Sequence, residues 1–488
     1  MDGSSGKSLS DFSGRLPFYY FKFKHGGRKF GFTHCFIATN RDRTLLRRVL
    51  ERGPFAIVSR SLFGLNLLAL ACLMPVLLPS SVLAEAGIAN PGETELAEWA
   101  QWRGPNRNGK IEGGNWPNSL GEETLKKQWS NVLGEGYASP VLTQDRVFSV
   151  ETRSKSEEVV RAFDRASGDQ IWEYVLPGAM KVPFFAAKNG SWARSTPATD
   201  GTRLFVLSML DVLTCLEVST GRVIWQVDFK AREGIGVPSF GGVSSPLIDG
   251  DSLIVQGGSA VAKLNGANSK YVWRVLEDRR GMFGGAFSSP VISRLHGVRQ
   301  LVVQTRSTLG GVHLESGDIL WSTPVEASRG MNILTPAIEG NRIFTATYGG
   351  GSFCYEVLEN PEGFSVELKW QKKKIEGYMS SPVILGNNIY HHGRDKRLRC
   401  MSIETGESLW VSDRVFGQYW SMVANGSRVL ALDQKGELIL FEASPLSFEI
   451  IDERTISDEP TWAHLAISGD QLFVRALNGL TAYQWIDN

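Results

Sequence analysis

The stretch that decides the fold is AFDRASGDQIW, residues 162–172. It ends in Trp172, which follows the turn glycine Gly168 by four residues and the small residue Ala162 by ten. Glycine is expected in this turn because the turn needs positive φ. We interpret the pattern as a large indole packed over a turn, with room made by a small side chain in the neighbouring strand.

The same pattern recurs along the chain. The tryptophans that follow a turn residue by four are Trp172, Trp225, Trp273, Trp321 and Trp410. Cys215, Gly311 and Cys400 occupy the small-residue position, whereas Lys263 departs from it. Cys354 lies in a similar position, so we expect all three cysteines to be buried structural thiols. The alternative, a bridge between Cys354 and Cys400, is not indicated by the pattern.

A second repeat is a small polar residue followed by proline, which opens an apolar strand. The prolines are spaced by 57, 49, 44, 46 and 46 residues, at Pro140, Pro197, Pro246, Pro290, Pro336 and Pro382. Ser421-Met422 and His464-Leu465 continue the series without the proline. A period of about 40 to 57 residues built from short strands predicts an all-β propeller of four-stranded antiparallel blades.

The eight strand openings predict eight blades. Seven is the alternative, if the weak repeat over residues 422–454 is an irregular insertion, since it has no tryptophan. The last repeat ends at Asn488 without an outer strand and its tryptophan. The strand around Trp129 supplies one, so we expect the N-terminal strand to complete the last blade and close the ring.

The N-terminal part of the chain carries a targeting pattern. We expect residues 1–53 to be a disordered basic extension. Residues 54–86 contain an apolar run, from Leu62 to Leu78, followed by small residues. This order predicts a secretory signal peptide, and the alternative is an uncleaved membrane anchor through residues 61–78.

The remaining chain divides into two expected parts. Residues 87–124 are predicted to be an extended N-terminal segment, and residues 125–488 the propeller. The formal net charge is +1, so no global field favours a nucleic-acid partner. No CxxC or CxxCH occurs, which leaves a thioredoxin-like redox site and a c-type haem unsupported. We expect an exported monomer of the periplasm or cell envelope.

The motif from Ala162 to Trp172 resembles the tryptophan-docking motif of the bacterial pyrroloquinoline-quinone (PQQ)-like propeller superfamily. The resemblance covers about residues 129–488, and residues 99–105 (WAQWRGP) are similar to the opening of exported members. It implies a quinoprotein-like fold. It does not fix function, because the superfamily includes both quinoprotein dehydrogenases and non-catalytic members such as the outer-membrane assembly lipoprotein.

A propeller brings two sets of loops together on one axial face. Here these loops carry aromatic and cationic side chains, from which we select as candidate ligand-binding residues Trp192, Arg194, Phe287, Arg306, Tyr348, Tyr378, Arg394, Lys396, Trp420, Asp433, Trp462 and His464. The same loops also carry Tyr137, Phe240, Met331 and Tyr419. Such a face suits a flat anionic ligand. The alternative is that the aromatics plug the channel and the cations are solvated.

The sequence favours a non-catalytic function. No adjacent cysteine pair exists, and no Glu/Asn/Asp calcium set matches the positions that the resemblance implies. We therefore expect a binding or scaffold module without catalytic residues, metal site or cofactor, which takes a protein partner or an envelope component on its axial face. The alternative is a PQQ- and Ca²⁺-dependent alcohol or sugar oxidoreductase with a divergent site.

Overall fold

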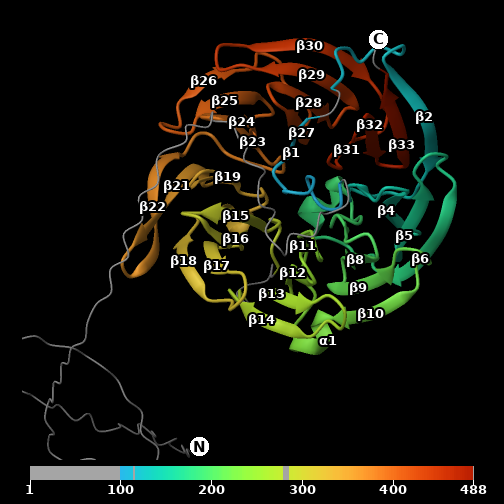
Figure 1. The fold of residues 1–488 in the computed structure, drawn as a ribbon, viewed down its shortest axis with the longest axis horizontal. Helices are drawn as coiled ribbons and strands as arrows, with labels where there is room; N and C mark the ends of the chain where they lie inside the picture. Colours follow the sequence, from blue (N-terminus) through green and yellow to red (C-terminus); the bar gives the residue numbers. More distant parts are fainter. Residues whose placement is uncertain (1–98, 114–115, 279–284, 487–488) are drawn as a thin grey trace, which may run out of the picture. The chain divides into compact units, whose positions relative to one another are not determined.

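The computed structural model describes residues 99–113, 116–278 and 285–486. In them, eight four-stranded antiparallel blades stand around a central axis (Figure 1). The all-β propeller prediction is confirmed, with eight blades rather than seven. The expectations for residues 1–53 and 54–86 lie outside the described residues. Within the described ranges, no helix is long and apolar enough to cross a membrane.

Each blade runs from an inner to an outer strand. The innermost strands of blades 1 to 8 are, in that order, β3 (Val141–Leu142), β7 (Ala198–Thr199), β11 (Leu247–Asp249), β15 (Val291–Leu295), β19 (Ala337–Glu339), β23 (Val383–Leu385), β27 (Trp420–Asn425) and β31 (Ala466–Ser468). The second strands are β4 (Arg146–Arg153), β8 (Arg203–Leu207), β12 (Ser252–Gly257), β16 (Val298–Gln304), β20 (Arg342–Thr347), β24 (Asn388–His392), β28 (Arg428–Asp433) and β32 (Gln471–Ala476).

The outer half of each blade has two further strands. The third strands are β5 (Glu157–Asp164), β9 (Val212–Glu217), β13 (Ala260–Asn265), β17 (Thr308–His313), β21 (Gly351–Asn360), β25 (Leu398–Ser402), β29 (Glu437–Ala443) and β33 (Gly479–Trp485). The outermost are β6 (Gln170–Pro177), β10 (Val223–Asp228), β14 (Tyr271–Val275), β18 (Ile319–Pro324), β22 (Gly363–Lys372), β26 (Ser408–Val411), β30 (Phe448–Thr455) and β2 (Leu125–Val132).

The ring closes through the N-terminal strand, as predicted. β2 pairs antiparallel with β33, and Trp129 lies opposite Ala482. The weak repeat near residues 422–454 forms a complete blade, β27 to β30. Three short helical elements interrupt the strands: η1 (Phe184–Asn189), α1 (Phe229–Glu233) and η2 (Ser328–Gly330).

The tryptophan pattern joins six of the eight blades to the following one. Trp172 lies opposite Ala162 in its own blade, which confirms the predicted small-residue position. The turn under the indole belongs to the next blade, where a Cβ on Gly221 would lie 2.6 Å from the Trp172 ring. The indole Nε1 donates to the Val218 carbonyl of that blade at 2.9 Å. Five other indoles donate in the same way to a backbone carbonyl of the following blade: those of Trp129, Trp225, Trp273, Trp370 and Trp410. The Trp321 indole instead donates to Gln300 of its own blade at 2.8 Å.

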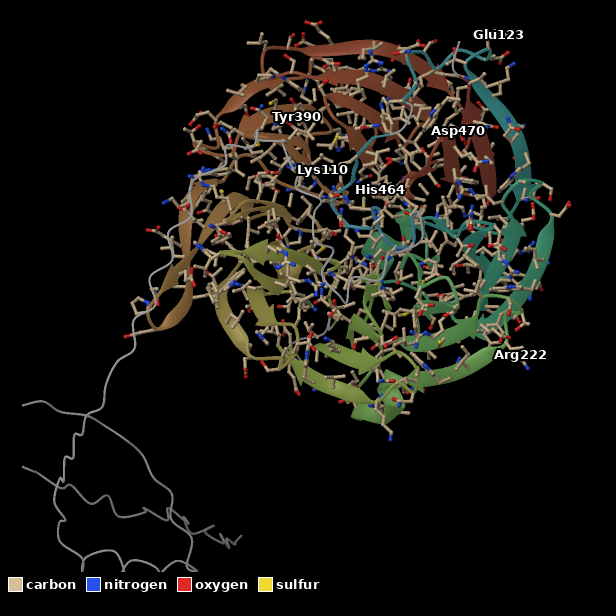
Figure 2. All side chains as sticks on the ribbon, in the orientation of Figure 1. Lys110, Glu123, Arg222, Tyr390, His464 and Asp470 are labelled. Carbon is tan, nitrogen blue, oxygen red and sulfur yellow. The ribbon has the colours of Figure 1, made fainter. Side chains whose placement is uncertain are left out.

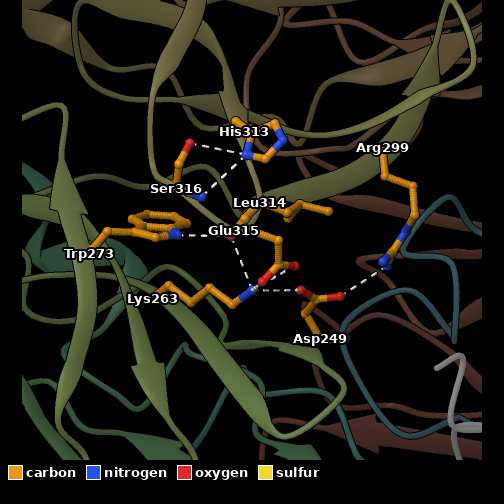
Figure 3. A network of polar contacts seen from close by, with 8 residues as sticks. All are labelled: Asp249, Lys263, Trp273, Arg299, His313, Leu314, Glu315 and Ser316. Atoms are coloured by element: carbon orange, nitrogen blue, oxygen red, sulfur yellow. Dashed lines mark hydrogen bonds and ion pairs between the residues drawn. The ribbon is translucent and has the colours of Figure 1, made fainter.

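Lys263, which departs from the small-residue pattern, forms a buried polar network between two blades (Figure 3). Its Nζ lies 3.1 Å from Asp249 and donates to the Leu314 carbonyl of the next blade at 3.0 Å. The Trp273 indole donates to the same carbonyl at 2.9 Å. Arg299 binds the other oxygen of Asp249 at 2.9 Å. A long cation here therefore replaces small-residue packing with an inter-blade contact.

The three cysteines of the propeller are free and buried, as expected. Cys215, Cys354 and Cys400 lie opposite Trp225, Trp370 and Trp410. Burial raises the thiol pKa values to between about 11 and about 12. These thiols are therefore packing groups beside the docked tryptophans, with little thiolate near neutral pH.

Candidate binding site on the propeller axis

A ring of hydroxyl groups ties the innermost strands together at the axis. The Thr196 N–H donates to Ser245 Oγ, and the Ser245 N–H donates to Ser289 Oγ, each at 3.0 Å. The Thr335 N–H donates to Ser381 Oγ at 3.1 Å in the same way. The His464 N–H reaches Ser139 Oγ of the first blade at 2.7 Å. This ring explains the Ser/Thr–Pro repeat, because five of its six hydroxyls accept a backbone N–H of the preceding blade. The sixth, Thr335 Oγ1, accepts an indole N–H instead.

Residues 99–113 run through the centre of the ring and contact the innermost strands. Lys110 and His464 lie near the axis, whereas Arg222 lies at the periphery (Figure 2). β1 (Lys110–Ile111) pairs parallel with β27 of blade 7. Leu142 of blade 1 donates its N–H to the Trp99 carbonyl at 3.1 Å. We call residues 99–113 the axial plug.

Two buried arginines fasten the axial plug. Arg107 donates to the carbonyls of Pro246 and Ser245 at 2.6 and 3.0 Å. Arg103 donates to the Pro382 carbonyl at 2.6 Å. Burial lowers the pKa of Arg107 to about 9 and that of Arg103 to about 10. The plug thereby joins blades 3 and 6 across the axis through backbone acceptors.

A cavity of about 480 Å³ opens on the face where the loops enter the innermost strands. Trp102 of the axial plug lines it, and its indole donates to Thr335 Oγ1 at 3.0 Å. Together with Trp102, the hydroxyl groups of Ser245, Ser289, Thr335 and Ser381 form the floor. We call this cavity the axial pocket. Its volume lies in the range of small-ligand and side-chain sites.

Aromatic rings form a large part of the wall. Tyr137 stacks on Trp462 with ring centroids 4.9 Å apart and an interplanar angle of 20°. Tyr419 stacks on the same indole at 6.3 Å. Phe240 meets Phe287 edge to face at 5.3 Å. Burial raises the pKa of both Tyr137 and Tyr419, so their hydroxyls stay protonated.

The charged groups that line the axial pocket are all cationic: Lys188, Arg194 and Arg329. None of its described lining residues is Asp, Glu, His or Cys. Arg194 Nη2 donates to the Gly190 carbonyl at 2.6 Å, and burial lowers the pKa of its guanidinium. Arg329 lies over the Phe185 ring at 5.4 Å. The pocket is therefore apolar and positively charged.

The structure brings five of the twelve candidate residues into the axial pocket: Arg194, Phe287, Tyr348, Tyr378 and Trp462. Two more lie beside it. Trp192 contacts Tyr137 edge to face at 5.2 Å, and Arg394 lies 4.1 Å over the Tyr348 ring.

The other five candidates lie elsewhere. Arg306 donates to the Arg329 carbonyl at 2.5 Å and lines a neighbouring cavity of about 20 Å³. Lys396 lies exposed in a turn with φ of 63°. Trp420, Asp433 and His464 are buried beneath the face.

The three buried candidates have structural partners. Trp420 stacks on His392 with ring centroids 5.7 Å apart. Asp433 Oδ1 accepts the Gly417 N–H at 2.6 Å. The His464 ring packs beside Trp99 and Trp102 of the axial plug, and burial lowers its pKa to about 3. The sequence placed them on the right loops but did not show which way their side chains turn.

Sequence reasoning did not select Phe185, Arg329 or Trp102 for the site. Phe185 lies on η1, in the loop between blades 1 and 2, where the proline spacing of 57 residues is the longest of the series. That excess length was the available signal for an insertion over the face. Trp102 was noted only for the resemblance of its segment, which gave no position on the axis.

A calcium-bound quinone does not fit the axial pocket. A hard cation needs several converging oxygen ligands, usually with carboxylates among them. The pocket presents three cations instead, and the described residues contain no cluster of three or more His, Cys, Asp or Glu that could hold a metal. No step of a quinone reaction can therefore be assigned to these residues.

The family described as outer membrane protein assembly factor BamB matches residues 156–412. The chain belongs to this family. BamB of Yersinia pestis is 20% identical over 369 residues, which cover 72% of this chain and 87% of the relative. BamB of Moranella endobia is 21% identical over 382 residues, with 72% and 88% covered.

Solved structures share the fold of this BamB-family chain. BamB from Moraxella catarrhalis superposes with a TM-score of 0.54 at 14% identity, covering 75% of this chain and 98% of the other. The quinohemoprotein alcohol dehydrogenase ADHIIG from Pseudomonas putida gives 0.53 at 12% identity, with 80% of each chain covered. The propeller is thus common to an assembly factor and an alcohol dehydrogenase, so the fold by itself does not decide the function.

Proposed function

We propose that the chain is a non-catalytic binding module of the cell envelope that takes a protein partner in its axial pocket. The observation that carries the proposal is the pocket itself, with aromatic walls, a hydroxyl floor and three cations. Aromatic and arginine side chains in a concave site are the groups that dominate protein recognition energies.

The chemistry of the lining supports binding rather than catalysis. General acid–base and metal-assisted reactions depend mainly on His, Asp, Glu or Cys. The described lining residues of the axial pocket contain none of these. Its tyrosines have pKa values raised by burial where a shift is resolved, which makes them poor bases near neutral pH.

The envelope part of the proposal rests on the relatives. The curated proteins that the chain resembles are named outer membrane protein assembly factors. The signal-like pattern over residues 54–86 agrees with export. We carry over the location and the non-catalytic character, and leave the identity of the partner to experiment.

Photocrosslinking in cells tests the proposal. A photoreactive amino acid is placed at Phe287 or Tyr378 in the axial pocket, and at Leu409, which is exposed on the outermost strand β26. We expect the same partner adduct from both pocket positions, none from Leu409, and loss of the adduct when Trp462→Ala is added. Adducts from Leu409 alone, or pocket adducts that Trp462→Ala leaves unchanged, contradict the proposal.

The enzymatic alternative needs a separate measurement. Purified propeller is mixed with PQQ and Ca²⁺, and quinone absorbance and dye-linked oxidation of alcohols and sugars are followed. We expect no turnover, because the pocket lacks carboxylate ligands for the cation. Turnover that depends on added PQQ would overturn the non-catalytic proposal.

A further inference from the structure

We infer that the axial pocket recognises a carboxylate next to an aromatic or apolar side chain on a segment of its partner. This inference rests on the proposed function and specifies the chemistry of the partner. It follows from the charge of the pocket, the position of Arg194, the stacked rings and the exposed apolar rim.

The charge of the axial pocket is uncompensated within the described residues. Among these residues, no carboxylate forms an ion pair with Lys188, Arg194 or Arg329. Arg394 on the same face differs, because its Nη1 lies 2.6 Å from Glu376. The three lining cations thus remain available to an external anion, whereas Arg394 is already neutralised.

Arg194 is the central cation. Its one hydrogen bond to a described residue goes to the Gly190 carbonyl, which fixes the guanidinium and leaves most of its N–H groups for a ligand. Tyr137 and Tyr378 line the same cavity and favour the charged form of its guanidinium. Burial lowers its pKa, and a bound carboxylate would restore the solvation that the guanidinium has lost.

The aromatic wall supplies the second half of the recognition site. Tyr137 is the link, since it stacks on Trp462 and lines the same cavity as Arg194. An aromatic or apolar side chain against this stack would place an adjacent carboxylate near the guanidinium. Rings of this kind gain from pairing beyond the burial of their surface.

The rim favours a peptide segment over a small molecule. Phe184 is 91% exposed on η1, and Phe185 beside it is 41% exposed, with the two ring centroids 5.7 Å apart. A molecule that filled only the cavity would leave Phe184 in water. A chain that crosses the rim covers this apolar surface and also delivers side chains into the pocket.

The test compares labelled, end-blocked octapeptides that differ at one central pair: Glu-Phe, Gln-Phe or Lys-Phe. Binding to the purified propeller is measured by fluorescence anisotropy at about 0.15 M salt, where long-range steering is screened. We expect the Glu-Phe peptide to bind on the order of tenfold more tightly than the other two. Free 3-phenylpropionate serves as the small-molecule probe, and we expect it to bind more weakly than the Glu-Phe peptide.

Variants assign the preference to the axial pocket. Arg194→Gln is expected to remove the carboxylate preference, and Arg329→Gln to reduce it. Lys435→Gln is the matched control, since Lys435 is exposed in the loop between β28 and β29 and does not line the pocket. It removes the same charge from the same face and should leave the preference intact. Thermal melting confirms that each variant is folded.

Three results would overturn the inference: equal binding of the three peptides, a carboxylate preference that survives both arginine variants, or tighter binding of 3-phenylpropionate than of the Glu-Phe peptide. The proposed function fails differently. Crosslinks from Phe287 and Tyr378 without any carboxylate preference would leave the binding role standing and refute only the ligand chemistry.

Discussion

Glu158 is a buried carboxyl group that connects blade 1 to the wall of the axial pocket. It is 1% exposed, and its Oε1 accepts the Met209 N–H at 2.8 Å. Met209 belongs to the small apolar cluster with Val182 and Phe240, and Phe240 lines the pocket. Burial raises the pKa of Glu158 to about 8 from the ordinary 4.5.

The raised pKa predicts a specific loss of stability with rising pH. Glu158 is neutral in both states below pH 4.5, so its contribution is fully present there. Between pH 4.5 and pH 8 the unfolded chain loses the proton while the folded chain keeps it, and stability falls. At pH 7 this cost is about 3 kcal/mol, from about 1.4 kcal/mol for each unit of difference.

Glu158→Gln should remove this cost. Glutamine keeps an oxygen that can accept the Met209 N–H but cannot ionise. We expect its free energy of unfolding to exceed that of the wild type by about 2 to 3 kcal/mol at pH 7, and the two to converge near pH 4.5.

The assay is urea denaturation at several pH values. Val160→Ala in the same strand is the control, because it removes buried apolar volume without changing a titratable group, and should shift stability equally at every pH. A difference between Glu158→Gln and wild type that stays constant from pH 4.5 to pH 8 would refute the reasoning.

Three further predictions follow from the fold. His464→Gln should reduce the stability that is lost on acidification. Buried His464 has a pKa of about 3 against the ordinary 6.5, so between pH 7 and pH 4 the unfolded chain gains a proton that the folded chain does not. This lowers the free energy of unfolding by about 3 kcal/mol, which acid denaturation curves measure. Trp172→Ala should lower the free energy of unfolding by about 3 to 5 kcal/mol, and thermal melting measures the loss. Trp225→Ala should lower it less, because Trp225 is only half-buried. Lys263→Met should lower the free energy of unfolding by about 2 kcal/mol, because Asp249 still has Arg299 as a partner. In urea denaturation, the double variant with Asp249→Asn should lose less stability than the sum of the two single variants.

The sequence predicted the blades well because the determinants are local and repeated. In most blades, a small residue opposite a tryptophan and a hydroxyl before a proline each serve one defined contact. The closing strand around Trp129 followed from counting strands. The turn beneath each indole was assigned only by the structure, because the contact joins different blades.

The site was predicted less completely because loop position does not determine side-chain direction. Tyr419 and Trp420 are neighbours on one entering loop, yet Tyr419 lines the axial pocket and Trp420 packs beneath it on His392. Arg194 and Arg394 were equivalent candidates, and only the structure shows that Glu376 neutralises the second. Contacts between residues far apart in sequence decide which cation is available.

The axial plug gives the propeller two unlike ends. Trp102 lines the axial pocket together with Trp462, which lies before β31. Asn108 and Lys110 of the same plug line another cavity with Ser468, which lies at the far end of β31. A segment that fills the axis therefore separates the two cavities. The three cations, the stacked rings and the exposed phenylalanines all lie at the Trp102 end of the plug, which is the arrangement that the proposed recognition of one partner segment requires.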